Sequence, residues 1–326
     1  VAAFDHRHIF LDPNPDSAKS FKERQRMFNL PRSSWEDYDA SLISKGGGII
    51  SRAEKSIAIT PEVRQALSIT SDEESMTPNQ LMTHILKADV DLLWNGGIGT
   101  YIKSSTETNP QVGDKANDGI RINGSDLRVK VVGEGGNLGA TQLGRIEAAA
   151  NGVKLNTDAI DNSAGVDTSD HEVNIKILLN HAITSGVLKA EDRNELLASM
   201  TDEVGLQVLR DNYEQNVVLE QSRQHAGPML RVHQRVMHGL ESSGLLNRAV
   251  EYLPSDAQID ALHNAGKGLT SPELSVLMAY VKIDMKQVKP ETTLYDEPWC
   301  SDVLRSYFPS ALRGKFADLM ETHPLR

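Results

Sequence analysis

The chain has 326 residues, of which 34 are Lys or Arg and 45 are Asp or Glu, which gives a formal net charge of −11. This length allows two domains, and the ordinary apolar content of 39% excludes a chain that is disordered throughout. The acidic balance argues against a nucleic-acid partner, because proteins that bind nucleic acid normally carry a basic patch or stripe.

The only cysteine is Cys300, so no disulfide can form within the chain, and a reducing compartment fits. No apolar run reaches the length of a membrane span and no signal peptide opens the sequence. We therefore expect a cytoplasmic protein with no membrane partner. Val1 stands where a natural start has Met, and a strand is already under way there, so we expect a fragment of a longer protein.

The first half of the chain alternates short apolar runs with helical patterns and glycine-rich turns. Apolar runs predict strands at residues 2–5, 8–11, 90–94, 128–132 and 153–156, and we expect 90–94 to be buried. Helical patterns predict helices at residues 17–30, from Thr77-Pro78 to Ala88, and from about Thr141. Residues 41–75 read as a loop or hairpin insertion, and residues 158–168 as a loop.

Strand, glycine-rich turn, helix and strand in succession are typical of a parallel α/β sheet. Ligands of such sheets bind at the carboxyl ends of the strands. Both glycine-rich turns, at residues 95–99 and 133–137, follow a predicted strand and so fall at that edge. The fold we predict is α/β, with a parallel sheet in the first half.

From about Ser169 the pattern becomes helical almost throughout, so we divide the chain into residues 1–180 and a helical region at 181–326. Four apolar stripes predict buried helix faces: Ile175, Leu178, Leu179 and Ala182; Leu206, Leu209, Tyr213 and Val217; Leu230, His233, Met237 and Leu240; Leu274, Leu277, Met278 and Val281. Either Thr270 or Ser271 caps the last of these helices.

Ser169 and Glu172 have the spacing of a capping box, which predicts a helix start at Ser169. A helix start also presents free N–H groups to a carboxylate, so a structural and a functional interpretation share one geometry. Asp170, His171 and Glu172 look like metal ligands, but successive helical residues point in different directions. We therefore assign no metal site, there or at His6 and His8.

Gly133 and Gly135 suggest a dinucleotide fingerprint, but Leu138 stands where a Gly or Ala is wanted. The spacing alone therefore favours a tight turn that needs glycines for its backbone. Asp5 ends the first predicted strand, where an acid can bind the ribose of NAD, although a surface Asp at a strand end is common. Arg7 beside it could instead meet the additional phosphate of NADP.

Longer strings carry a resemblance to a known family. Residues 130–141 and 156–172 closely resemble the large NAD-specific glutamate dehydrogenases, as do residues 2–16 and 90–101. The likeness extends over essentially the whole chain. It implies a Rossmann-like parallel sheet that lacks its first βα unit, followed by an all-α C-terminal region.

A more distant likeness to the small glutamate dehydrogenases assigns roles to single residues. It implies that NAD is bound by Asp5, Asn95, Gly96, Gly97, Asn137 and Asn162. It implies that Asn162 also contacts the amino-acid substrate, and that Ser169 meets the substrate's side-chain carboxylate. Ala164, Gly136 and the Asp170-His171 pair depart from the pattern of the small enzymes.

The implied reaction is the oxidative deamination of L-glutamate to 2-oxoglutarate and ammonia. The resemblance puts the catalytic lysine and aspartate in an upstream substrate domain of the same polypeptide, so we expect no catalytic residue in this chain and no turnover from it alone. We also expect a homo-oligomer. The alternatives are a non-catalytic oligomerisation or regulatory module and a dehydrogenase of another amino acid.

Overall fold

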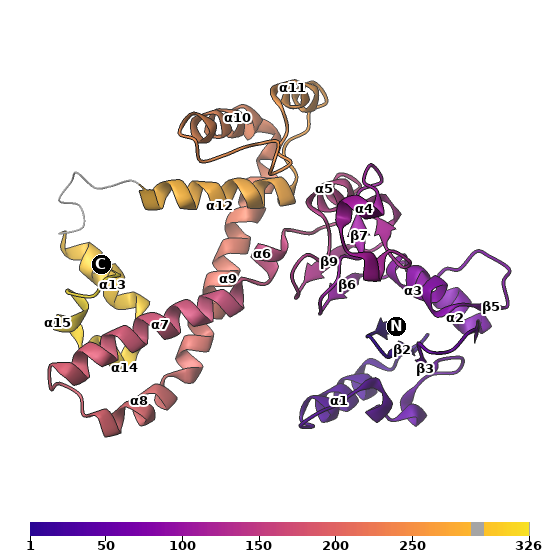
Figure 1. The fold of residues 1–326 in the computed structure, drawn as a ribbon, viewed down its shortest axis with the longest axis horizontal. Helices are drawn as coiled ribbons and strands as arrows, with labels where there is room; N and C mark the ends of the chain where they lie inside the picture. Colours follow the sequence, from indigo (N-terminus) through magenta and orange to yellow (C-terminus); the bar gives the residue numbers. More distant parts are fainter. Residues whose placement is uncertain (288–296, 326) are drawn as a thin grey trace. The chain divides into compact units, whose positions relative to one another are not determined.

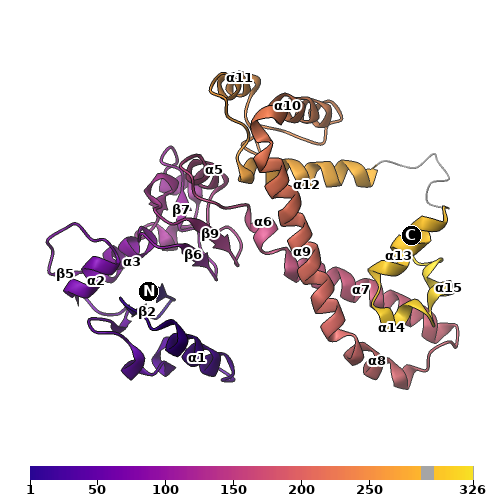
Figure 2. The same cartoon turned by 180° about the vertical axis from the view of Figure 1, so that it is seen from behind.

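The computed structural model describes residues 1–287 and 297–325, and the chain divides into two compact units, Val1–Leu155 and Asn156–Arg326. The first unit mixes strands and helices, and the described part of the second unit is helical (Figure 1 and Figure 2). The α/β class is therefore confirmed. Residue 180, where we ended the nucleotide-binding region, lies inside the helix α7 (Ser163–Thr184).

An antiparallel sheet opens the first unit. It consists of β1 (Ala2–Phe4), β2 (His8–Leu11) and β3 (Gly48–Ser51), in that order. The two predicted strands are confirmed. The interpretation of residues 41–75 as a loop or hairpin insertion was wrong, since this segment supplies β3 at an edge of the sheet. The segment also contains β4 (Ile57–Ala58) and α2 (Pro61–Ala66), and it ends in β5 (Ser75–Met76), which pairs antiparallel with β4.

Local signals fix the helices of this unit. Asp16 caps α1 (Ser17–Phe28), and its carboxylate accepts hydrogen bonds from two backbone N–H groups of the first turn. Thr77 begins α3 (Pro78–Leu86) with a capping box that uses Gln80. A four-residue helix, α4 (Asn109–Val112), follows later. The predicted helices at 17–30 and from Thr77-Pro78 are confirmed.

Two parallel strand pairs form the second half of this unit. One joins β6 (Leu92–Asn95) to β9 (Val131–Glu134), and the other joins β7 (Ile102–Lys103) to β8 (Ile122–Asn123). Single parallel bridges connect Ile102 with Ala140 and Val131 with Lys154. Helix α5 (Gln142–Ala150) follows β9, as predicted, and Thr141 caps it. The parallel pairing is confirmed, but as two separate pairs of strands.

Strand β6 is not the buried strand that its apolar composition predicts. Leu92 is 54% exposed and Trp94 61% exposed, while Leu93 packs against the core formed with β9 and α5. Alternate residues of a strand point to opposite faces. One face of β6 is therefore covered and the other is open among the described residues.

The second unit is built from ten helices in its described residues. They are α6 (Asp158–Asp161), α7 (Ser163–Thr184), α8 (Arg193–Ser199), α9 (Thr201–Gln224), α10 (Ala226–Ser242), α11 (Asp256–Asn264), α12 (Ser271–Gln287), α13 (Pro298–Tyr307), α14 (Ser310–Arg313) and α15 (Ala317–Met320). One core joins α9, α10, α11 and α12, and a second joins α7 to α13, α14 and α15. Thr270 precedes α12, and its backbone N–H and hydroxyl both donate to Oε2 of Glu273. Of the two candidates, Thr270 is therefore the capping residue.

Three of the four predicted apolar faces are buried, and the face on α9 was wrong. Leu206, Leu209 and Tyr213 are each about two-thirds exposed. The buried apolar residues of α9 are instead Val208 and Leu219. The side of α9 that faces α7 carries polar residues between Val208 and Leu219. The most apolar stripe of α9 is therefore not the face that packs.

The predicted helix start at Ser169 was also wrong. Helix α7 begins at Ser163, and the predicted loop at residues 158–168 holds α6 and the first turns of α7. The Ser169 hydroxyl donates to the carbonyl oxygen of Val166 inside the helix, at 2.8 Å. A serine bonded to the preceding turn does not cap a helix.

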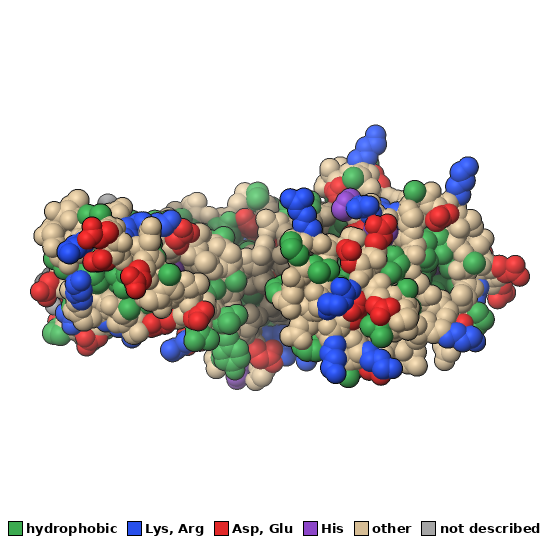
Figure 3. All heavy atoms as spheres, turned by 90° about the horizontal axis from the view of Figure 1, so that it is seen from below, with side chains coloured by type: hydrophobic (Ala, Val, Ile, Leu, Met, Phe, Trp, Pro, Cys, Tyr) green, Lys and Arg blue, Asp and Glu red, His purple; other side chains and the backbone are tan. Residues whose placement is uncertain are grey.

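On the face shown in Figure 3, Lys and Arg side chains lie among Asp, Glu and apolar side chains. No helix of the described residues is both long enough and apolar enough to cross a membrane.

Candidate functional site

Two glycine-rich loops meet at the carboxyl ends of β6 and β9. Asn95 and Glu134 are register partners at the last position of the two parallel strands. The Asn95 carbonyl oxygen accepts hydrogen bonds from the backbone N–H groups of Gly135 and Gly136, at 2.8 and 3.1 Å. A Cβ atom on Gly136 would collide with the backbone of Gly97. Glycine is therefore required here because the two loops are in backbone contact.

A buried ion pair holds the second loop against α5. Arg145 donates from Nε and Nη2 to the two carboxylate oxygens of Glu134, at 2.7 and 2.9 Å, and both side chains are buried. Oε1 of Glu134 also accepts from the backbone N–H of Ala140, at 3.0 Å. A bidentate, charge-assisted pair is among the stronger polar contacts in proteins. It fixes the loop between β9 and α5.

The side-chain amide of Asn95 lies at the base of these loops. Its Nδ2 atom is buried and has no hydrogen-bond partner among the described residues. Buried donors normally have a partner, and leaving one unpaired costs about 1–3 kcal/mol. Gly96 and Gly97 beside it are exposed, as is Asn137 in the facing loop. An unpaired donor next to open glycine backbone is typical of a place that a polar ligand completes.

Leu138 adopts a left-handed backbone conformation with φ of 57°. Its carbonyl oxygen accepts a hydrogen bond from Oγ1 of Thr100, at 2.7 Å, and its side chain is exposed. A residue with a Cβ rarely adopts this conformation, and such backbone strain collects at functional sites. Leu138 is also the residue at which the sequence departs from a dinucleotide fingerprint.

Asp5 lies in the turn between β1 and β2. Its Oδ1 atom accepts from the backbone N–H groups of Arg7 and His8, each at 2.7 Å. Burial acts to raise the pKa of Asp5, but these hydrogen bonds outweigh it and lower the pKa. The carboxylate is thus ionised and ready to accept hydrogen bonds. The strand before Asp5, β1, is paired antiparallel with β2, and among the described residues it has no parallel partner.

The two residues expected to contact substrate lie in the second unit. Asn162 stands between α6 and α7, and its backbone N–H donates to Asp158, at 2.8 Å. Ser169 is exposed two turns further along α7. Asn162 therefore occupies the N-terminal end of a 22-residue helix, the position that we had expected for Ser169.

The pairing of Arg145 with Glu134 was not predicted from the sequence. The available signal was an arginine on the inner face of a helix that is otherwise rich in alanine, four residues after the Thr141 cap. A cavity of about 390 Å³ in the first unit was not anticipated either. It is lined by Leu11, Gly46, Gly47, Thr60 and Val63, among others, and by none of the predicted cofactor residues.

Comparison with known proteins gives matches along most of the chain. The family described as "Bacterial NAD-glutamate dehydrogenase, catalytic domain" matches residues 1–222, and "Glutamate dehydrogenase, C-terminal" matches residues 266–326. Proteins named NAD-specific glutamate dehydrogenase are 54% identical in Pseudomonas aeruginosa, 52% in Mycobacterium tuberculosis and 50% in Halomonas elongata. Each match covers 100% of this chain and 20% of the relative, so the chain spans a fifth of the length of these proteins.

Proposed function

We propose, because the chain belongs to the family of the bacterial NAD-glutamate dehydrogenase catalytic domain, that it is part of an NAD-dependent glutamate dehydrogenase. The reaction of the whole protein is then the oxidative deamination of L-glutamate to 2-oxoglutarate and ammonia. This chain contributes cofactor binding and one wall of the substrate pocket. The observation that carries the proposal is the backbone contact of Gly136 with Gly97 at the carboxyl ends of two parallel strands.

The finer fold assignment belongs to the same proposal. Strands β6 and β9 would be neighbours in a Rossmann-like sheet, and the Ile102–Ala140 and Val131–Lys154 bridges would extend it. In open sheets of this kind, ligands bind outside the carboxyl ends of the strands. Parallel sheets are normally covered on both faces, whereas one face of β6 is open. The chain spans a fifth of the relatives' length, so another part of the whole protein would cover this face.

The residues at the loops suit a dinucleotide. NAD, when bound, supplies the hydride acceptor for the reaction. The unpaired Nδ2 of Asn95 is placed to donate a hydrogen bond, and the exposed backbone of Gly96 and Gly97 allows close approach. Asn137 would orient the cofactor, and the Asp5 carboxylate would accept hydrogen bonds from a ribose. These contacts align the reacting groups and leave proton transfer to other residues.

We propose that Asn162 contacts both the cofactor and the substrate, and that Ser169 contacts the substrate. The N-terminal end of α7 offers the positive end of a helix dipole at Asn162, which suits a carboxylate. The hydroxyl of Ser169 is exposed and can donate to a carboxylate once it leaves the Val166 carbonyl. Both roles rest on the resemblance in residues 156–172.

Gly97→Ala in the whole protein tests the cofactor assignment. A Cβ atom on Gly97 would meet nothing within 4 Å, so folding should be unaffected. If the cofactor lies against this loop, the methyl group obstructs it, and we expect KM for NAD to rise roughly tenfold, about 1.4 kcal/mol of binding. Gly205→Ala, on α9 and also in open space, is the matched control. An unchanged KM in Gly97→Ala would remove this loop from the site.

Ser169→Ala tests the substrate assignment. Loss of a carboxylate contact should raise KM for glutamate and leave KM for NAD unchanged. Ser306→Ala is the matched control, because the hydroxyl of the exposed residue Ser306 likewise donates to the carbonyl oxygen three residues before it, on α13, at 2.7 Å. Equal kinetics of the two variants would remove Ser169 from the pocket. Asn162→Ala is expected to raise KM for glutamate and also to lower kcat, since loss of the Asn162 side chain would misalign the cofactor.

The 326-residue chain alone is expected to show no turnover and weak NAD affinity. The resemblance assigns the proton-transfer lysine and aspartate to another domain, and the chain spans 20% of its relatives. A steady-state assay with glutamate and NAD checks this expectation. Measurable turnover would show that the chain carries proton-transfer groups of its own.

We also propose a homo-oligomer and a cytoplasmic location. The exposed residues Leu206, Leu209 and Tyr213 on one face of α9 support a partner surface, because exposed apolar patches commonly mark interfaces. Light scattering of the whole protein measures its oligomeric state. A monomer at all concentrations would contradict the first part of this proposal.

A further inference from the structure

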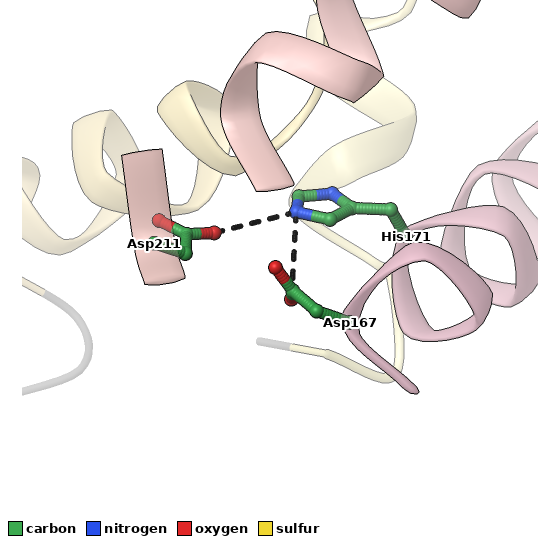
Figure 4. Close-up of side chains that lie close together, drawn as sticks. All are labelled: Asp167, His171 and Asp211. Carbon is green, nitrogen blue, oxygen red and sulfur yellow. Dashed lines mark ion pairs between the residues drawn. The ribbon is translucent and has the colours of Figure 1, made fainter. Parts of the chain in front are cut away.

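A histidine and two aspartates gather between α7 and α9 in the second unit, and the two of them on α7 flank Ser169 at a distance of two residues along the chain. Asp167 and His171 lie one turn apart on α7, and Asp211 faces them from α9 (Figure 4). Nε2 of His171 is 3.9 Å from Oδ1 of Asp167 and 3.6 Å from Oδ2 of Asp211. One ligand atom from each residue falls within 4.8 Å of the other two.

His171 is the reason to look for a ligand here. His171 is 2% exposed, and neither nitrogen of its ring has a hydrogen-bond partner among the described residues. The ring stacks on Tyr307, with centroids 4.5 Å apart, and its Nε2 atom points at both carboxylates. Buried polar nitrogens without partners are rare, because each loses its hydration without compensation.

A simple ion pair does not account for this geometry. Charge-assisted N–H···O bonds are about 2.7–2.9 Å long. In the same unit, His238 makes such a bond to Asp256, at 2.9 Å. Asp211 has a half-exposed side chain with room to adjust, yet stays 3.6 Å from His171. The separations are too long for hydrogen bonds.

These separations suit a shared metal ion. Nitrogen and oxygen ligands about 2.1 Å from a tetrahedral ion lie roughly 3.4 Å from one another. Imidazole favours zinc and its transition-metal neighbours over magnesium and calcium, which prefer oxygen ligands alone. We propose that Asp167, His171 and Asp211 bind one divalent transition-metal ion of the zinc type. Three protein ligands leave a fourth position for water.

The charges around the cluster agree with this proposal. The carboxylates of Asp167 and Asp211 approach the same nitrogen of His171, so their like charges repel one another in the empty cluster. A divalent cation removes that repulsion. The other nearby groups are Asp170 and Tyr307, whose hydroxyl hydrogen-bonds Oδ2 of Asp170 at 3.3 Å. No Lys or Arg forms an ion pair with either aspartate of the cluster among the described residues.

Zinc titration of the full 326-residue chain by calorimetry tests the site. We expect one Zn²⁺ per chain and at least a hundredfold weaker response to Mg²⁺. Asp211→Asn should weaken zinc binding by more than the roughly tenfold to hundredfold that changes outside the ligand shell cause. Asp211 is half exposed, so this variant should fold. Asp202→Asn, an exposed aspartate on the same helix, should bind zinc as the unchanged chain does.

His171→Gln gives the second test. Zinc should raise the melting temperature of the unchanged chain, because it binds the folded state, and a chelator should reverse this rise. The rise should vanish in His171→Gln and persist in His263→Gln, a change at an exposed histidine. Zinc binding that survives both Asp211→Asn and His171→Gln would overturn the proposal, as would no binding by the unchanged chain. These readouts do not depend on dehydrogenase activity.

Discussion

Glu134→Gln should destabilise the first unit strongly. The substitution keeps the size of the side chain and removes the charge that faces Arg145. Glu134 is 1% exposed and Arg145 is 4% exposed, so water cannot replace the lost carboxylate. Removing one partner of a buried ion pair typically costs about 3–5 kcal/mol.

Hydrogen exchange of residues 128–140 measures this cost at the site itself. If exchange follows the opening equilibrium, 3–5 kcal/mol accelerates it roughly a hundredfold to several thousandfold. Asp91→Asn is the matched control. It removes the partner of Lys130 from an ion pair of 2.6 Å next to the same strand, but both side chains are about four-fifths exposed. Exposed pairs contribute about 0–1 kcal/mol, so exchange there should change at most about fivefold.

Equal hydrogen-exchange rates in the two variants would contradict this prediction. Glu134→Gln would then cost no more than a surface pair, and the loop between β9 and α5 would be held by its glycine contacts and the Thr141 cap. In the double variant with Arg145→Met, we expect a smaller loss than the sum of the single changes, since both changes break one interaction.

The remaining predictions concern packing and pH. Val303→Glu should change the free energy of unfolding by less than about 0.5 kcal/mol, since Val303 is exposed, whereas Leu230→Ala, in the core of the second unit, should cost about 2–5 kcal/mol; urea unfolding measures both. The hydrogen bond from Arg26 lowers the pKa of Glu23 to about 2. A depressed pKa stabilises the fold above the ordinary pKa of the carboxyl, and this contribution is lost as pH falls toward 2, so Glu23→Gln should flatten the loss of stability over that range.

Features set by neighbouring residues were predictable from the sequence. The caps at Thr77 and Thr141 and the glycine turns after β6 and β9 each need only a few adjacent residues. The contact of Gly136 with Gly97 explains why both turns are rich in glycine, although the sequence could not show that one turn requires the other. The pairing of Glu134 with Arg145 likewise depended on the angle at which α5 leaves β9.

The sheet was harder to predict because apolar runs do not reveal their partners. Residues 2–5 read equally well as a parallel or an antiparallel strand, and β1 pairs antiparallel with β2. Residues 41–75 looked irregular because β3 contains Gly48 and Ser51 and lies at the edge of its sheet. Composition likewise predicted a buried β6, yet Trp94 lies against the backbone of Gly133 and remains largely exposed.

The error on α9 and the cluster beside it have one cause. Periodicity ranks helix faces by apolar content, so it selected Leu206 and Leu209. The face that packs on α7 instead presents Asn212 and Gln215, which contact Ser163, and Asp211, which approaches His171. Polar groups that pair across two helices leave no apolar signal in either sequence segment. A search for polar residues at helical spacing on both segments would have found this interface, and it is the interface that carries the candidate metal ligands.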